Sequence, residues 1–180
     1  MTFTLKKTVA MVGMMGAGKT AVGKAVAQIL DVPFLDSDSE IEQAANMTIP
    51  EIFERDGEPF FRKKETQVIS RLLDGKPCIL STGGGAFLAE VNRSAINEKG
   101  VAVWLDADLE LLWSRVKNKN TRPLLRTENP LETLKTIFEQ RTPVYKMAQV
   151  RVKSSPDTSV EDMANRVVAA LKTRQDVLES

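Results

Sequence analysis

Histidine is absent from this sequence of 180 residues, and cysteine occurs once, as Cys78. Without histidine the chain has no imidazole ligand for a metal, no histidine-containing catalytic triad and no imidazole general base. A single cysteine cannot form an intramolecular disulfide framework. Because Cys78 lies within the apolar run 77–80, we expect its thiol to be buried and unreactive.

The chain also lacks a long hydrophobic run and an excess of charge of either sign. No apolar run is long enough to span a membrane, and residues 1–7 lack the apolar core of a signal peptide. The 25 basic and 24 acidic side chains give a net charge of +1, which argues against a nucleic-acid-binding or membrane-surface protein. We therefore expect a cytoplasmic protein with neither kind of partner.

Strand-like and helical patterns alternate along the chain, which predicts an α/β fold with a parallel sheet between helices. The β-prone runs are 9–12, 33–35, 78–80, 101–105 and 150–152, and the helical patterns lie near 19–30, 38–45, 58–73, 89–98, 108–117, 130–147 and 159–173. Capping boxes at 48–51 and 158–161 mark two helix starts. The tail 175–180 is expected to fray. With 42% hydrophobic residues and no evident dimerisation stripe, we expect one domain and a monomer.

The glycine-rich segment 13–20 fits the pattern G-x-x-x-x-G-K-[ST] at every fixed position. It lies between a β-prone run and a helical pattern, which is the context that a phosphate-binding loop requires. Its backbone N–H groups and the helix N-terminus would hold a polyphosphate. Lys19 would reach the β- and γ-phosphates, and the Thr20 hydroxyl would bind Mg²⁺. The expected ATP-binding residues of this segment are Gly13, Gly16, Ala17, Gly18, Lys19, Thr20 and Ala21.

A dinucleotide-binding fingerprint is a competing interpretation of the same segment. Residues 16–21 satisfy G-x-G-x-x-[GA], and Asp36 or Asp38 follows at about the distance that this fingerprint requires. The dinucleotide pattern does not account for Gly13, or for the lysine and hydroxyl that follow the last glycine of the loop. We therefore favour the phosphate loop.

Two polar segments, 48–62 and 117–130, interrupt the alternation of strands and helices. Between positions 111 and 127 there is no acidic residue, whereas Arg115, Lys117, Lys119, Arg122 and Arg126 all fall there. Charge of one sign suits a lid that carries a cation to the transferring phosphoryl group, although a solvated loop is the alternative. Arg122, which stands directly before a proline, is the expected cation.

Acidic residues at strand ends are candidates for a second Mg²⁺ anchor. Asp36 and Asp106 each end an apolar run, and Asp38 follows two positions after the first. In extended backbone Asp36 and Asp38 would project to the same side. One carboxylate would then face the metal, and the other would accept a hydrogen bond from the attacking hydroxyl. For Asp106 we favour an acid at a helix N-terminus.

Three consecutive glycines, Gly83, Gly84 and Gly85, follow the β-prone run 78–80. Ligands of open α/β sheets bind beyond the carboxyl ends of the strands, so this glycine triplet would bring backbone N–H groups close to a small ligand. A flexible turn is the alternative. Arg62 and Arg141 could each bind a carboxylate or phosphate through a planar guanidinium, although single arginines are more often surface residues.

Together these motifs resemble the shikimate kinase family, in order and over nearly the whole chain. The matching segments are 16–20, 36–38, 57–62, 82–85, 122–125 and 141–145. The resemblance implies a three-layer P-loop kinase with a five-stranded parallel sheet, which phosphorylates the 3-hydroxyl of shikimate with MgATP. It implies one domain over 1–180, with a substrate-binding segment near 37–62 and a lid near 117–130.

The resemblance also implies roles in binding the acid substrate. Arg62 and Arg141 would bind the shikimate carboxylate. Gly84, between its two glycine neighbours, would present its backbone to the substrate. Asp38 would hold the hydroxyls and orient or deprotonate the nucleophile.

On the nucleotide side, the resemblance implies that Thr20 and, through water, Asp36 would hold Mg²⁺. Arg122 would close over the phosphates, and Arg115 would flank the adenine. Two alternatives remain: another small-metabolite kinase, such as a gluconate or nucleoside monophosphate kinase, and a catalytically silent relative. The first would not need Arg62, the glycine triplet and Arg141 together, and the second would be expected to have lost Lys19, Asp38 or an arginine.

Overall fold

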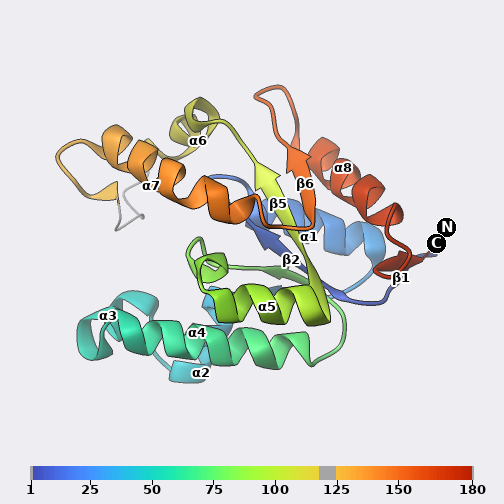
Figure 1. Cartoon of the computed structure of the whole chain (residues 1–180), viewed down its shortest axis with the longest axis horizontal. Coiled ribbons are helices and arrows are strands. Elements are labelled where there is room, and N and C mark those ends of the chain that lie inside the picture. Colours follow the sequence, from blue (N-terminus) through green and yellow to red (C-terminus); the bar gives the residue numbers. More distant parts are fainter. Residues whose placement is uncertain (1, 118–124, 180) are drawn as a thin grey trace.

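Five parallel strands form the central sheet of the computed structural model, which describes residues 2–117 and 125–179 (Figure 1). The strand order is β3-β4-β2-β5-β6, and every neighbouring pair is parallel. The strands are β2 (Thr8–Val12), β3 (Phe34–Asp36), β4 (Ile79–Ser81), β5 (Gly100–Asp106) and β6 (Val150–Lys153). This order confirms the predicted five-stranded α/β architecture.

Helices cover the sheet, and the central strand β2 and its neighbour β5 are buried along their entire length. A strand with both faces covered needs an apolar run rather than an alternating pattern, which is why these segments have the sequences TVAMV and GVAVWLD. The helices are α1 (Lys19–Leu30), α2 (Ser37–Ala45), α3 (Ile49–Asp56), α4 (Glu58–Leu73), η1 (Ala86–Leu88, a 3₁₀ turn), α5 (Glu90–Lys99), α6 (Leu109–Val116), α7 (Pro130–Tyr145) and α8 (Val160–Lys172). None of the described helices is both long and apolar enough to cross a membrane.

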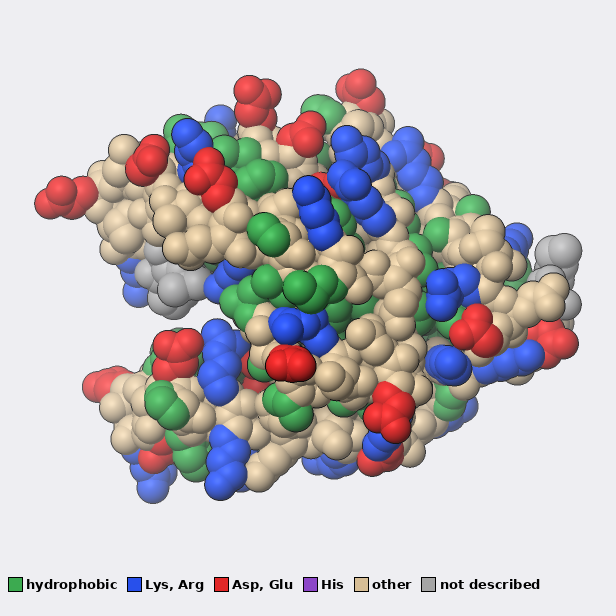
Figure 2. Space-filling model, viewed as in Figure 1, with side chains coloured by type: hydrophobic (Ala, Val, Ile, Leu, Met, Phe, Trp, Pro, Cys, Tyr) green, Lys and Arg blue, Asp and Glu red, His purple; other side chains and the backbone are tan. Residues whose placement is uncertain are grey.

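Two separate hydrophobic clusters divide the molecule. The large cluster surrounds the sheet and joins α1, α5, α6 and α8 to it. A small cluster of Ile41, Ile52, Phe61 and Val68 holds α2, α3 and α4 together. These three helices project from one side of the sheet (Figure 1), and Figure 2 shows a cleft between them and α7. The cleft opens at the carboxyl ends of the strands, where an open α/β sheet binds its ligands.

The chain ends depart from the sequence predictions. The tail does not fray, because β7 (Leu178–Glu179) pairs antiparallel with β1 (Thr4–Leu5). Val177 and Leu178 are buried, so their apolar surface stabilises this pairing of distant segments. Cys78 is buried, as predicted.

Capping explains the starts of two helices. The predicted capping box at Thr48 and Glu51 is confirmed at the start of α3. The second box is shifted by one residue from its predicted position: Ser159 is the N-cap of α8, and its partner is Asp162. In each box the hydroxyl oxygen accepts from the backbone N–H three residues on, and the acidic side chain accepts from the N-cap N–H.

Candidate active site

The phosphate loop connects the carboxyl end of β2 to the first residue of α1. Gly13, Gly16 and Gly18 have φ values of 147°, 85° and 93°, a region that side chains with a Cβ rarely adopt. A Cβ on Gly16 would also lie 2.9 Å from the Val116 side chain. Lys19 Nζ donates to the Gly13 carbonyl at 2.6 Å, so the lysine side chain folds back across the loop. The predicted ATP-binding residues 13–21 therefore form one continuous loop and helix start.

Arg115, on α6, lies directly against this loop. Its Nη1 donates to the Gly16 carbonyl at 2.8 Å, and partial burial lowers the pKa of its guanidinium. The predicted adenine contact of Arg115 stays a prediction. Arg122, the predicted lid cation, lies outside the described residues.

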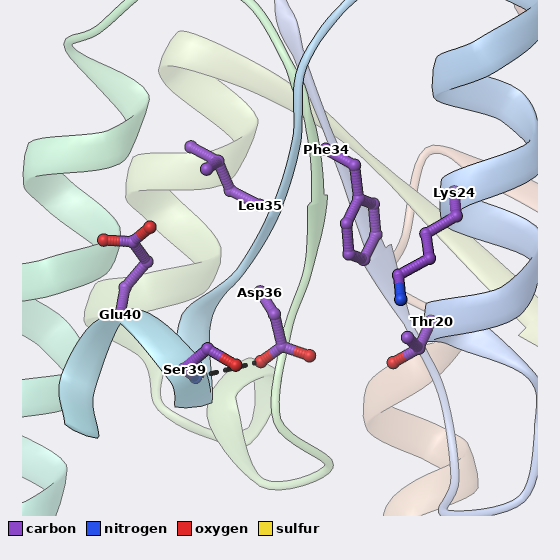
Figure 3. A pocket seen from close by; sticks show the side chains of 7 residues that line it. All are labelled: Thr20, Lys24, Phe34, Leu35, Asp36, Ser39 and Glu40. Carbon is purple, nitrogen blue, oxygen red and sulfur yellow. Dashed lines mark hydrogen bonds between the residues drawn. The ribbon is translucent and has the colours of Figure 1, made fainter. Parts of the chain in front are cut away.

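Asp36 and Thr20 face each other across an open hollow of about 330 Å³ (Figure 3). Asp36 ends β3 and is the N-cap of α2, where its Oδ1 accepts from the backbone N–H groups of Asp38 and Ser39 at 2.9 and 3.2 Å. The second carboxylate oxygen points toward Thr20 (Figure 3). Our expectation of extended backbone from Asp36 to Asp38 is wrong, because the helix begins at Ser37. The two carboxylates still interact electrostatically, since the charge of Asp36 raises the pKa of Asp38.

The oxygen ligands Thr20 and Asp36 suit Mg²⁺ better than a thiophilic metal or a metal bound only by protein side chains. Within residues 2–117 and 125–179, no three Cys, Asp or Glu side chains form a metal-binding group. Mg²⁺ in kinases needs no such cage, because waters and substrate phosphates complete its coordination. The Thr20 hydroxyl on one side of the hollow and the second carboxylate oxygen of Asp36 on the other fit that requirement.

Asp106 is not available to a metal, because Arg151 of the neighbouring strand binds its carboxylate. Arg151 Nη2 and Nε lie 2.5 and 2.8 Å from Asp106 Oδ2. Our interpretation of Asp106 as a helix-terminal acid missed this partner. The N-cap of α6 is Asp108.

Asp38 lies in the first turn of α2, with its carboxylate against the glycine triplet. A Cβ on Gly83 would lie 2.8 Å from Asp38 Oδ1. This oxygen is buried and has no hydrogen-bond partner among the described residues. Burial, and then the charge of Asp36, raises the pKa of Asp38, while Lys19 and Arg62 act in the opposite direction.

Each of the other two glycines faces one of the two predicted arginines. A Cβ on Gly84 would lie 3.0 Å from Arg141 Nη1, and a Cβ on Gly85 would lie 2.6 Å from Arg62 Nη2. There is therefore a steric reason for glycine at all three positions, because a side chain at any of them would displace a charged group. The structure brings Asp38, Arg62 and Arg141 together around it.

Glu65 is a residue of this site that our sequence analysis missed. It is 1% exposed, and its Oε1 lies 2.9 Å from Arg62 Nη1. Burial raises the pKa of Glu65, which the neighbouring Arg62 opposes. The spacing i to i+3 within a helical pattern was the available signal, because such residues lie on the same helix face. A buried partner limits the positions open to the Arg62 guanidinium.

A phosphate loop at the end of the central strand, together with a carboxylate and two arginines that meet at a glycine triplet, defines a P-loop kinase. Comparison with known proteins identifies the family within this class. A family model described as "Shikimate kinase" matches residues 15–172. The chain belongs to the shikimate kinase family.

Individual relatives cover nearly the whole chain. The shikimate kinase of Ruegeria pomeroyi is 67% identical over 175 residues, which cover 97% of this chain and 90% of that protein. The shikimate kinase of Cereibacter sphaeroides is 68% identical over 176 residues, covering 98% and 88%. A solved structure, the shikimate kinase from Acinetobacter baumannii in complex with shikimate, is 37% identical, with a TM-score of 0.87 and 94% of each chain covered. A gluconokinase from Sinorhizobium meliloti, at 17% identity and a TM-score of 0.63, shares the fold alone.

Proposed function

We propose that this chain transfers the γ-phosphoryl group of ATP to the 3-hydroxyl of shikimate and releases shikimate 3-phosphate. Shikimate kinase activity accords with its family, and the reaction is a step of chorismate and aromatic amino-acid biosynthesis. The observation that carries the proposal is the meeting of Asp38, Arg62 and Arg141 at the glycine triplet. These groups complement a small molecule that bears both a carboxylate and hydroxyls.

The two arginines would bind the carboxylate of the acid. Guanidinium groups can donate two parallel hydrogen bonds to a carboxylate, which fixes its orientation as well as its charge. Arg62 comes from α4 and Arg141 from α7, so the bound acid would lie in the cleft between these helices (Figures 1 and 2). Glu65 would keep Arg62 in place while the acid enters.

Asp38 would act on the hydroxyl that attacks ATP. The oxygen Oδ1 has no partner among the described residues and is a natural acceptor for that hydroxyl. A carboxylate whose pKa is raised by burial is a stronger proton acceptor than an ordinary aspartate. As the new O–P bond forms and the bond to ADP breaks, the hydroxyl proton would pass to Asp38.

The phosphate loop would hold the β- and γ-phosphates through its backbone N–H groups and Lys19. When bound, Mg²⁺ supplies positive charge that offsets the charge building on the phosphate oxygens. Thr20 and Asp36 are the residues that would hold it, with Asp36 acting through a water. Arg115 would flank the adenine of ATP.

The remaining assignments concern the whole chain. Residues 1–180 would form a single domain, with a substrate-binding segment over 37–62 and a lid over 117–130 that carries Arg122. A monomer is proposed because the sequence has no evident apolar stripe for dimerisation. A cytoplasmic location is supported by the need for ATP as co-substrate.

A coupled assay of ADP release tests the function directly. With MgATP, we expect rapid ADP release when shikimate is present and very little when it is absent. Gluconate and nucleoside monophosphates serve as alternative acceptors, and none should replace shikimate. Binding of shikimate without any ADP release would indicate a catalytically silent relative instead.

A further inference from the structure

Tyr145, the last residue of α7, is buried and makes a contact that the predicted site does not use. It is 1% exposed and is the only tyrosine of the chain. Its hydroxyl donates to the Gly84 carbonyl at 2.6 Å. Burial raises the pKa of the phenol, which the charge and hydrogen bond of Arg141 oppose, so the phenol stays a hydrogen-bond donor. The tyrosine therefore ties the end of α7 to the loop that follows β4.

The position of the phenol ring is fixed by packing. The Trp104 ring of β5 lies 6.3 Å from it, centroid to centroid, at an angle of 30°. Trp104 is 4% exposed and also borders the phosphate loop, because a Cβ on Gly13 would lie 3.6 Å from its ring. A ring held in this way presents its hydroxyl at a fixed point and loses little entropy in doing so.

The Gly84–Gly85 peptide is the group whose orientation Tyr145 sets. In a planar trans peptide the C=O and N–H bonds point in opposite directions, so a Gly84 carbonyl held toward Tyr145 aims the Gly85 N–H away from it. This N–H donates no hydrogen bond within the described residues, in contrast to the Gly83 N–H, which donates to Ser37 Oγ at 3.2 Å. It is therefore available to a ligand.

The same peptide lies between the two arginines of the acid site. Gly84 lies against Arg141 and Gly85 lies against Arg62, since a Cβ on either glycine would come within 3.0 Å of the facing guanidinium. Arg141 and Tyr145 are four residues apart on α7 and so lie on the same face of the helix. One end of α7 thus supplies both an arginine and the hydroxyl that fixes the backbone beneath it.

We infer that Tyr145 is a positioning residue for the acid substrate. It holds the Gly84–Gly85 peptide so that the Gly85 N–H and the two guanidinium groups converge on one carboxylate. This inference rests on the proposed function and adds a positioning residue to it. The hydroxyl acts through the peptide and through the neighbouring Arg141 side chain, which also interacts with it.

Tyr145→Phe tests the inference, because it keeps the ring and removes only the hydroxyl. We expect the KM for shikimate to rise about tenfold, since a carbonyl left without its partner reorients toward water. The KM for ATP and the kcat at saturating shikimate should change less than about threefold, because the lost interaction concerns only binding of the acid. Calorimetric titration with shikimate should show the same loss in affinity.

Thr8→Val is the matched control, because it removes a buried hydroxyl far from the site. Thr8 is 2% exposed, and its Oγ1 accepts from the Cys78 N–H at 3.3 Å at the amino end of β2. We expect both variants to lower Tm, but only Tyr145→Phe to change the KM for shikimate. An unchanged KM in an active Tyr145→Phe enzyme, or an equal rise of the KM for both substrates, overturns the inference. Absence of shikimate-dependent ADP release in the wild type overturns the proposed function instead.

A second measurement does not depend on the stability of the variant. Fluorotyrosine incorporated into the wild-type protein labels Tyr145 alone. We expect shikimate to shift its fluorine resonance in the absence of nucleotide, and MgADP alone to leave it nearly unchanged. A resonance that responds to MgADP but not to shikimate contradicts the inference.

Discussion

The phosphate loop lies within one continuous segment, residues 13–20, whereas the groups around the glycine triplet come from α2, α4, α7 and the loop after β4. The phosphate loop follows β2, which is buried along its whole length in the large hydrophobic cluster. The acid side depends in part on the small cluster that joins α2, α3 and α4. A site built from one segment needs only its own backbone, while a site assembled from several elements needs each of them in place.

This difference predicts that binding of the nucleotide at the phosphate loop and binding of the acid at the glycine triplet can be weakened separately. Substitutions around the glycine triplet should weaken binding of the acid and leave the nucleotide in place. Asp38 is the exception, because it belongs to the acid side but acts on the reacting hydroxyl. Each half of the site should therefore respond to its own set of substitutions.

The largest effect is expected for Asp38→Asn. The amide cannot accept the hydroxyl proton, so kcat should fall about 10³-fold, within the range for loss of a general base. The affinity for ATP, measured by equilibrium binding, should stay within about twofold of the wild type, because the phosphate loop is untouched. Normal turnover in this variant would show that Asp38 is not the proton acceptor.

Arg141→Lys should have the next largest effect. A lysine keeps the charge but cannot donate two parallel hydrogen bonds, so the KM for shikimate should rise about 30-fold. Arg71→Lys is the control, since Arg71 has a 59% exposed side chain that pairs with Glu40 on the surface. An equal increase in the KM for ATP would mean that the arginine serves the nucleotide, against our assignment.

Gly85→Ala should produce a smaller loss of acid binding. The new Cβ would lie 2.6 Å from Arg62 Nη2 and displace the guanidinium, so the KM for shikimate should rise about tenfold. The φ of Gly85 is −93°, so the backbone accepts alanine without strain. Gly75→Ala is the matched control, because its Cβ would meet nothing closer than 3.4 Å. Equal kinetics for the two variants would contradict the steric account of the triplet.

The smallest effect concerns pH. Burial raises the pKa of Asp38 above its ordinary value of 3.8. The carboxylate must be unprotonated to accept a proton, so kcat/KM for shikimate should decline, as the pH falls, at a higher pH than an ordinary aspartate would cause. A pH profile whose acid midpoint lies at or below the ordinary value would contradict the effect of burial.

The same contrast explains how much of the protein could be predicted from its sequence. All five strands of the sheet were predicted within one or two residues, because buried strands have apolar runs that stand out between helical patterns. The pairing of β1 with β7 was missed, since two-residue strands carry no periodic signal and depend on a partner at the opposite end of the chain. The extended backbone expected from Asp36 to Asp38 was wrong, because only Asp36 is extended and its side chain caps α2, which begins at Ser37.

In the site, the phosphate loop was predictable because its residues are contiguous and their spacing carries the chemistry. The glycine triplet was predicted to approach a ligand, but its match to Asp38, Arg141 and Arg62, one glycine to each, depends on the packing of three separate helices. The Gly84 contact of Tyr145 crosses 61 positions of sequence and leaves no local pattern. Glu65 could have been found, because it lies three residues from Arg62 on a predicted helix.

The most direct test of the central claim, that the glycine triplet and its two arginines select a carboxylate, compares shikimate with its neutral carboxamide as phosphoryl acceptor. The amide keeps every hydroxyl of the acid and removes only the charge. With the wild-type enzyme we expect kcat/KM to fall at least about 100-fold for the amide, and with Arg141→Lys we expect this difference to shrink. Equal kcat/KM values for the two acceptors would contradict the account.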